Sequence, residues 1–235
     1  DAIIHYCTTI ALRVILTRRA ALASNYYSEP FWYIPLDADF TPQKFQSDWV
    51  MLANRYANTA VIGVDLWDEP KQTTTWAAGD AETDWNTAAT NAGNAILAVN
   101  PHWLIFVQGV GADTWWGGNL QGVVDNPIEL NIPNQLVYAV TDFPTEIYPQ
   151  LWLTDPTFPS NMRPRWDAFW GFIFKQNIAP VMISSFGALL NTAQSRQWMQ
   201  AIVNYADGQF TTDGLIELTA NQLGLSWSYS AVNAD

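Results

Sequence analysis

The feature that most constrains the fold is an alternation along the chain. Short apolar runs rich in β-branched residues alternate with longer segments whose apolar residues recur at helical spacing. Six segments are predicted to be strands: 12–17, 60–67, 103–110, 136–140, 181–185 and 225–229. Helices are predicted ahead of the first strand and at 41–56, 82–99, 163–176, 192–206 and 213–222. Strands that alternate with helices pair in parallel. The pattern predicts an α/β fold, and it allows either an open sheet or a closed barrel.

The length and the charge narrow the class of protein further. With 235 residues, no internal repeat and no low-complexity linker, we predict a single domain over residues 1–235. The chain has 22 acidic and 10 basic residues, so its surface is expected to repel nucleic acids and anionic membranes. No apolar run reaches transmembrane length, and the first residues lack the cleavage site of a signal peptide.

Three carboxylates follow the predicted strand at 60–67. The segment 61–70 reads VIGVDLWDEP, which places Asp65, Asp68 and Glu69 where a buried strand ends. Burial and neighbouring like charges raise the pKa of a carboxyl group, and a raised pKa suits a general acid at neutral pH. The competing interpretation is that they are loop carboxylates capping the next turn.

The same segment resembles the strand-four signature of glycoside hydrolase family 5, in which an Asn-Glu-Pro contains the acid/base glutamate. The resemblance extends to the stretches 92–110, 115–122, 148–162 and 177–187, which are similar to bacterial endo-β-1,4-glucanases of that family. It implies a TIM-type (β/α) barrel, a β-linked glucan as substrate, an extracellular location and no cofactor. The match begins in the helix before the family's third strand, so we expect an incomplete barrel without a counterpart of strands one and two.

The family's retaining chemistry uses two carboxylates, one as acid/base and one as nucleophile. By the resemblance, Glu69 occupies the acid/base position. The nucleophile is expected in a Gly-Glu-Phe-Gly, but this chain reads Ser184-Ser185-Phe186-Gly187, so Ser185 stands in place of the carboxylate. A serine hydroxyl requires a base to become a nucleophile.

Other positions also differ from the family's pattern. The expected Asn, strand-five Glu, and strand-six His and Tyr correspond to Asp68, Gln108, Thr141 and Phe143, and the strand-three Arg-His-Arg-Pro reads Arg18-Arg19-Ala20 at best, without the His. This number of changes, spread over separate strands, suggests a site that is no longer maintained for hydrolysis.

Several aromatic and polar positions agree better with the family's sugar-binding cleft. The positions expected to contact substrate, together with the substituted ones, are Trp32, Asp68, Trp115, Trp116, Asn119, Thr141, Asp142 and Trp227. Each Trp could instead be an ordinary packing residue. The two histidines, His5 and His102, are too few and too distant from the carboxylates to indicate a metal site.

The leading functional hypothesis is a catalytically degenerate cellulase-like protein with a glycan-binding, structural or assembly role. A protein partner or a second copy could then cover the missing barrel strands. The alternative is an active endo-β-1,4-glucanase with Glu69 as general acid. One form of this alternative is an inverting enzyme in which Asp142 or Asp68 activates a water molecule.

Overall fold

The structure is a computed structural model that describes residues 1–20, 31–71, 73–111, 113–208 and 224–231. The chain divides into two compact units, Asp1–Tyr138 and Ala139–Asp235. Strand β4 (Leu136–Asp142) begins in the first unit and ends in the second. The helix predicted at 213–222 lies outside the described residues.

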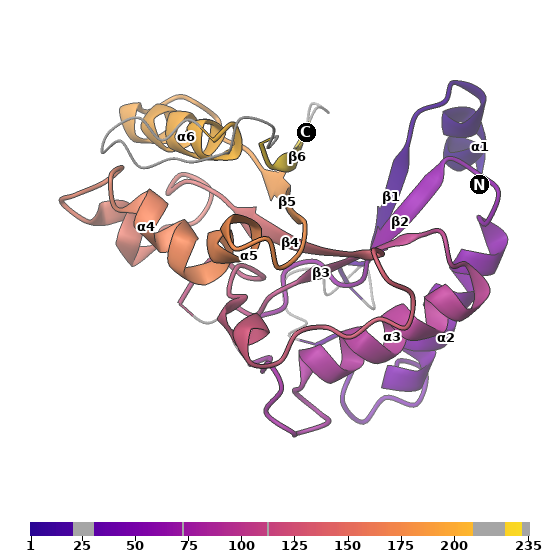
Figure 1. Ribbon diagram of the computed structural model, residues 1–235. Helices are drawn as coiled ribbons and strands as arrows, with labels where there is room; N and C mark the ends of the chain where they lie inside the picture. The colour runs from indigo at the N-terminus through magenta and orange to yellow at the C-terminus, as the bar shows by residue number, and fades with distance from the viewer. Residues whose placement is uncertain (21–30, 72, 112, 209–223, 232–235) are drawn as a thin grey trace. The chain divides into compact units, whose positions relative to one another are not determined.

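The first unit contains the first three predicted strands and the helices between them (Figure 1). Its elements are α1 (Ala2–Thr9), β1 (Val14–Thr17), α2 (Pro42–Arg55), β2 (Val61–Asp65), α3 (Trp85–Val99), β3 (Leu104–Gln108) and a short 3₁₀ turn (Gln121–Val124). Strands β1, β2 and β3 pair in parallel, with Leu16 opposite Val64 and Val64 opposite Ile105. These sequence predictions are confirmed, with strands a few residues shorter than expected.

Local sequence explains where the two long helices of this unit begin. The Thr41 side chain accepts a hydrogen bond from the Lys44 N–H, and Pro42 occupies the first helical position of α2. The Asp84 carboxylate caps α3 in the same way by accepting from the Thr87 N–H. Helices α2 and α3 lie side by side (Figure 1). Trp49 on the buried face of α2 donates its indole N–H to the Leu66 carbonyl just beyond β2.

The second unit contains the remaining helices and strands. After the end of β4 its elements are a 3₁₀ turn (Leu151–Thr154), α4 (Met162–Trp166), a π-helical segment (Asp167–Gly171), α5 (Phe172–Lys175), β5 (Val181–Phe186), α6 (Ala193–Ala206) and β6 (Ser226–Tyr229). Strands β5 and β6 pair in parallel, with Ile183 opposite Trp227.

The helix predicted over 163–176 is confirmed, but a π-helical turn interrupts it. Asp167 in this turn accepts a hydrogen bond from the Tyr205 hydroxyl at 2.6 Å and forms an ion pair with Lys175. A Cβ atom at Gly171 would lie 1.7 Å from the same hydroxyl. The turn therefore makes room for Tyr205 of α6.

The strand order distinguishes the two folds that the sequence allowed. In the part of the chain that the structure describes, six strands follow one another in the sheet in chain order, from β1 to β6. A doubly wound open sheet reverses its strand order at a switch point, whereas a (β/α) barrel keeps chain order throughout. The order is that of consecutive strands of a barrel.

Candidate active site

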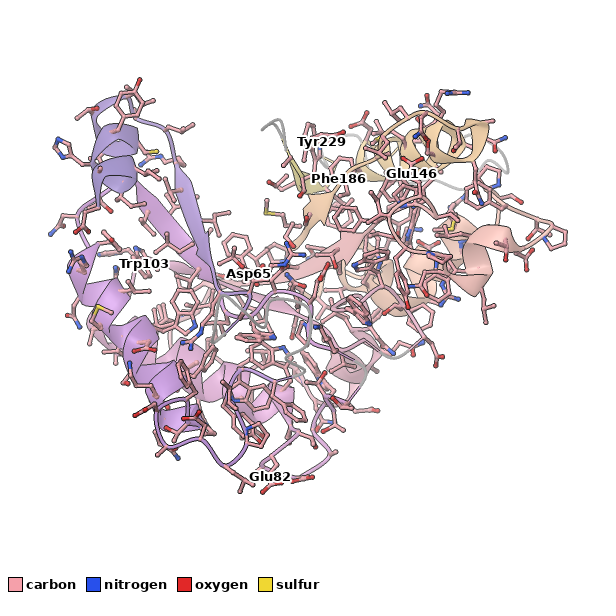
Figure 2. All side chains as sticks on the ribbon, turned by 180° about the vertical axis from the view of Figure 1, so that it is seen from behind. Asp65, Glu82, Trp103, Glu146, Phe186 and Tyr229 are labelled. Atoms are coloured by element: carbon pink, nitrogen blue, oxygen red, sulfur yellow. The ribbon has the colours of Figure 1, made fainter. Side chains whose placement is uncertain are left out.

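Three buried carboxylates lie at the carboxyl end of β2 in the first unit. Asp65 is the last residue of β2 (Figure 2), and Asp68 and Glu69 follow it. Glu69 has a φ of 56°, in the left-handed region that costs a non-glycine residue free energy. The backbone is therefore held in an unfavourable conformation at the residue that the family resemblance assigns as the acid/base.

Gln108, at the end of β3, connects all three acidic residues. Its Nε2 donates to Asp65 Oδ2 at 2.8 Å and to Asp68 Oδ1 at 2.9 Å. Its Oε1 accepts from the backbone N–H of Glu69 at 2.9 Å. The sequence comparison treated Gln108 only as a departure from a family pattern, and the structure places it at the centre of the cluster.

The Glu69 carboxylate has a partner on each oxygen. Trp115 donates its indole N–H to Oε1 at 2.9 Å, and Arg19 donates to Oε2 at 3.2 Å. Arg19 also forms an ion pair with Asp68 at 2.9 Å. In sequence, Arg19 stands only in an approximate match to the family's strand-three Arg-His-Arg-Pro, and no role in the site is predicted for it. A second signal is its position two residues beyond β1, on the same sheet edge as the ends of β2 and β3.

Burial sets the protonation of this cluster. Desolvation, followed by the charge of Asp68, raises the pKa of Glu69, and the Arg19 charge and the Trp115 hydrogen bond oppose that rise. Desolvation, again followed by Asp68, raises the pKa of Asp65 to about 8. Asp65 is therefore largely neutral at pH 7, while Glu69 combines a raised pKa with an adjacent cation.

The aromatic residues predicted to stack on sugar differ in exposure within this unit. Trp32 is 1% exposed, and its ring lies 5.2 Å from the Trp85 ring, so its surroundings support a packing role. Trp115 is also buried, whereas Trp116 is half-buried with the Lys71 ammonium 5.4 Å from its ring centre. Asn119 accepts a hydrogen bond from the Gln121 N–H through its side chain.

In the second unit, the predicted residues of β4 are buried. Thr141 and Asp142 are the last two residues of the strand, and Phe143 follows them. Trp166 donates its indole N–H to Asp142 Oδ2 at 2.5 Å. Desolvation raises the pKa of Asp142 to about 7, and the Trp166 hydrogen bond is the largest opposing influence. Asp142 is thus harder to ionise than an ordinary aspartate.

Ser185 lies on β5 and is half-buried. Its neighbour Ser184 donates its hydroxyl to the Val140 carbonyl at 3.2 Å. Phe186 lies beside Tyr229 at the ends of β5 and β6 (Figure 2), and its ring also meets Trp227 edge-on at 5.7 Å. Trp227 is 54% exposed, so its ring has surface free for a ligand.

A comparison with known protein families shows which family the chain belongs to. Residues 1–232 match the model of the cellulases of glycosyl hydrolase family 5. The chain belongs to glycosyl hydrolase family 5. An endoglucanase of Paenibacillus polymyxa is 42% identical over 215 residues, which cover 87% of this chain and 53% of that protein. The major extracellular endoglucanase of Xanthomonas campestris is 34% identical over 186 residues, 74% of this chain and 37% of that one.

Solved structures of the family agree with the fold. An endocellulase of Pyrococcus horikoshii in complex with cellotetraose superposes with a TM-score of 0.79 at 30% identity, over 88% of this chain and 62% of that one. The catalytic domain of the Xanthomonas campestris endoglucanase gives a TM-score of 0.80 at 28% identity, over 98% and 64% of the two chains. The chain spans about half the length of the curated relatives it matches. The prediction of a TIM-type (β/α) barrel fold is confirmed.

The structure brings together part of the predicted site. Within the first unit, Asp68, Glu69 and Trp115 are joined by direct contacts through Arg19 and Gln108.

Among the described residues, no three His, Cys, Asp or Glu side chains are arranged to hold a metal ion. In the same part of the chain no helix is long and apolar enough to cross a membrane.

Proposed function

We propose that this chain is a β-1,4-glucan-binding member of family 5 that does not perform the family's retaining hydrolysis. The main supporting observation is Ser185, a hydroxyl on β5 at the position where the family resemblance expects the nucleophilic carboxylate. A retaining enzyme needs that carboxylate to form the glycosyl-enzyme bond. Loss of one essential member of a catalytic unit lowers the rate on the order of 10⁴–10⁶-fold.

The carboxylates at the end of β4 and just beyond it, Asp142 and Glu146, are poor replacements for the missing group. Asp142 accepts a hydrogen bond from Trp166, and its pKa of about 7 leaves much of it neutral. Glu146 accepts hydrogen bonds from the backbone N–H groups of Leu189 and Leu190. Both side chains therefore have structural partners that compete with a role as nucleophile or base.

One neighbour of Glu69, Arg19, acts against proton donation. Arg19 is in ion-pair contact with its carboxylate, and a guanidinium beside a carboxylate favours the ionised form. An acid must carry its proton before it can protonate a leaving oxygen. Arg19 thus opposes the property that burial gives to Glu69.

Binding of a neutral glucan agrees with the aromatic residues that remain accessible. Trp227 is exposed and Trp116 is half-buried, and aromatic rings can pack against the apolar faces of sugar rings. The Pyrococcus horikoshii relative was solved with cellotetraose bound. We therefore propose cello-oligosaccharides as ligands, and an extracellular location because one relative is named a major extracellular endoglucanase.

A second candidate is an active endo-β-1,4-glucanase with an altered mechanism. The raised pKa of Glu69 favours it, since burial and Asp68 would help Glu69 to keep a proton. In that case Asp142 or Asp68 would activate water, and hydrolysis would invert the anomeric configuration.

Cellotetraose binding and turnover, measured on the same protein, separate these functions. We expect calorimetric binding by the unaltered chain with no hydrolysis above background. Ser185→Glu should gain hydrolysis that is lost again when Glu69→Gln is added, whereas Ser185→Ala should gain none. Turnover by the unaltered chain that disappears in Glu69→Gln would refute the proposal, and loss of that turnover in Asp142→Asn would support the inverting mechanism.

We also propose a protein partner or a second copy of the chain beside α1. Ile3, Tyr6 and Ile10 are exposed on and just after this helix at spacings of three and four residues, which places them on one face. Light scattering of the unaltered chain and of Tyr6→Glu tests this. A monomer in both cases at high concentration would exclude self-association.

A further inference from the structure

Three hydrogen bonds meet on the buried side chain of Gln108. One N–H of its amide donates to the Asp65 carboxylate and the other donates to the Asp68 carboxylate. Its carbonyl oxygen accepts from the backbone N–H of Glu69. Gln108 is 0% exposed, so these bonds have no competition from solvent. A glutamine amide offers two N–H donors and one carbonyl acceptor group, and all of them are used here.

The directions of these bonds determine which chemical group is tolerated at each position. An ionised carboxylate at 108 would place its oxygens about as close to those of Asp65 and Asp68 as the amide nitrogen is now, at 2.8 and 2.9 Å. Like charges at such a distance in a buried site strongly disfavour each other. An amide at position 68, with Gln108 unchanged, would lose the charge that Arg19 contacts. Each single change therefore leaves an unfavourable contact.

Exchanging the two groups restores the hydrogen bonds that Gln108 makes, although Arg19 would then contact an amide at position 68. An amide at 68 could donate to an acid at 108, and the other oxygen of that acid could accept from the Glu69 N–H. Asp65 could donate its proton to the same acid, since its pKa of about 8 keeps it largely neutral at pH 7. The number of carboxylates around Arg19 and Glu69 would stay the same.

The backbone around Gln108 is held independently of this exchange. Trp85 donates its indole N–H to the Gln108 carbonyl at 2.8 Å. Gly117, at a φ of 80°, lies so close that a Cβ atom there would be 2.3 Å from Gln108 Oε1. A side chain at 108 is thus directed at the Glu69 backbone, whichever of the two groups it bears.

We propose that Asp68 and Gln108 form one acid–amide pair that positions Glu69, and that the acid and the amide can exchange places but cannot be changed singly. Gln108 holds the Glu69 backbone at its unfavourable φ, and Asp68 holds Arg19 against the Glu69 carboxylate. Gln108 is in this sense a positioning residue. The proposal concerns the site of the proposed function, but it is tested in the free protein and does not depend on glucan binding.

The test compares Asp68→Asn, Gln108→Glu and the double variant in the full chain. The chain has six glutamates, so glutamate labelled at its side-chain carboxyl carbon gives few NMR signals. The signal of Glu69 is identified as the one that is missing from the spectrum of Glu69→Gln. We expect Gln108→Glu to raise the pKa of Glu69 by about one unit or more, because it adds a nearby negative charge. Asp68→Asn should lower this pKa, because it removes one.

The double variant decides the outcome. Opposite charge changes alone would already return the Glu69 pKa close to its original value, so the free energy of unfolding from urea denaturation decides. A loss in the double variant that is smaller than the sum of the two single losses, together with a Glu69 pKa within about half a unit of the original, supports the pair. Single losses that simply add, a Glu69 pKa that is not restored, or a double variant that does not fold would overturn the proposal. Gln121→Glu, an exposed change of the same type, should leave the Glu69 pKa unchanged.

Discussion

The two units differ in the partners that surround a buried carboxylate near the end of a strand. Glu69 in the first unit has an arginine on one oxygen and an indole N–H on the other, and its neighbours are joined through Gln108. Asp142 in the second unit is held chiefly by the indole N–H of Trp166. Burial raises the pKa in both cases, and Glu69 in addition forms an ion pair with Arg19. The first unit thus keeps an organised acidic cluster, while the second has a buried acid and, at Ser185, a hydroxyl.

The comparison also changes the meaning of two sequence departures. The family pattern expects an amide before the acid/base glutamate and an acid on strand five, and this chain has Asp68 and Gln108. The structure joins the two residues by one hydrogen bond. In the proposed pairing they are a reciprocal exchange of an acid and an amide, and not two independent losses. Ser185 in the second unit, by contrast, has a hydroxyl where the family resemblance expects a carboxylate.

The largest effect is expected from Gly117→Ala, which would disrupt the cluster of the first unit. The added Cβ would lie 2.3 Å from Gln108 Oε1 at a φ of 80°. We expect a loss of about 4 kcal/mol in the free energy of unfolding, from overpacking and backbone strain together. Urea denaturation measures it. Gly79→Ala is the matched control, since its φ is 79° with no atom within 4 Å of the added Cβ, and it should cost only about 1 kcal/mol. Equal losses in the two variants would show that the Gln108 contact is unimportant.

An intermediate effect is expected on the pH dependence of stability, through Asp142 in the second unit. Its folded pKa of about 7 lies above the unfolded value of 3.8, so the folded state binds more protons between these values. This group therefore stabilises the fold less as pH rises through that window, and its contribution is lost above the folded pKa. Asp142→Asn does not lose this contribution. Its free energy of unfolding, relative to that of the unaltered chain, should therefore rise by about 2 kcal/mol from about pH 5 to about pH 8.

Urea midpoints of both proteins at the two pH values measure this difference. Asp65→Asn provides the corresponding measurement in the first unit, where the window extends to about pH 8. A midpoint difference between Asp142→Asn and the unaltered chain that does not change with pH would mean that Asp142 is ionised throughout.

The smallest effect is expected from Arg19→Gln, which makes the surroundings of Glu69 more like those of Asp142. Loss of the cation should raise the Glu69 pKa further and cost about 1–2 kcal/mol of stability, since Arg19 is partly exposed. NMR titration and urea denaturation measure the two effects. Arg18→Gln is the control, because Arg18 pairs with Asp48 at 3.2 Å. A Glu69 pKa that shifts equally in both variants would exclude a specific role for Arg19.

The regular elements could be predicted from sequence because their causes are local. Helix α2 begins where Thr41 and Pro42 predict it, and all six predicted strands are present. The π-helical turn at Asp167–Gly171 was not predictable, because the hydroxyl that it accommodates comes from Tyr205, more than thirty residues away. Likewise, the apolar character of Trp32 could not show that neighbouring rings would leave it 1% exposed.

Sequence by itself therefore determined the α/β alternation, the strand-end position of Glu69 and the serine at 185. Periodicity, capping and residue identity are properties of short segments, and they are fixed before the chain folds. Only the tertiary structure decided which groups surround Glu69: Arg19 comes from the end of β1, Gln108 from β3 and Trp115 from the loop beyond it. Hydrogen bonds and desolvation depend on distances of a few ångströms between segments far apart in the chain, and the parallel sheet sets those distances by bringing the strand ends to one edge.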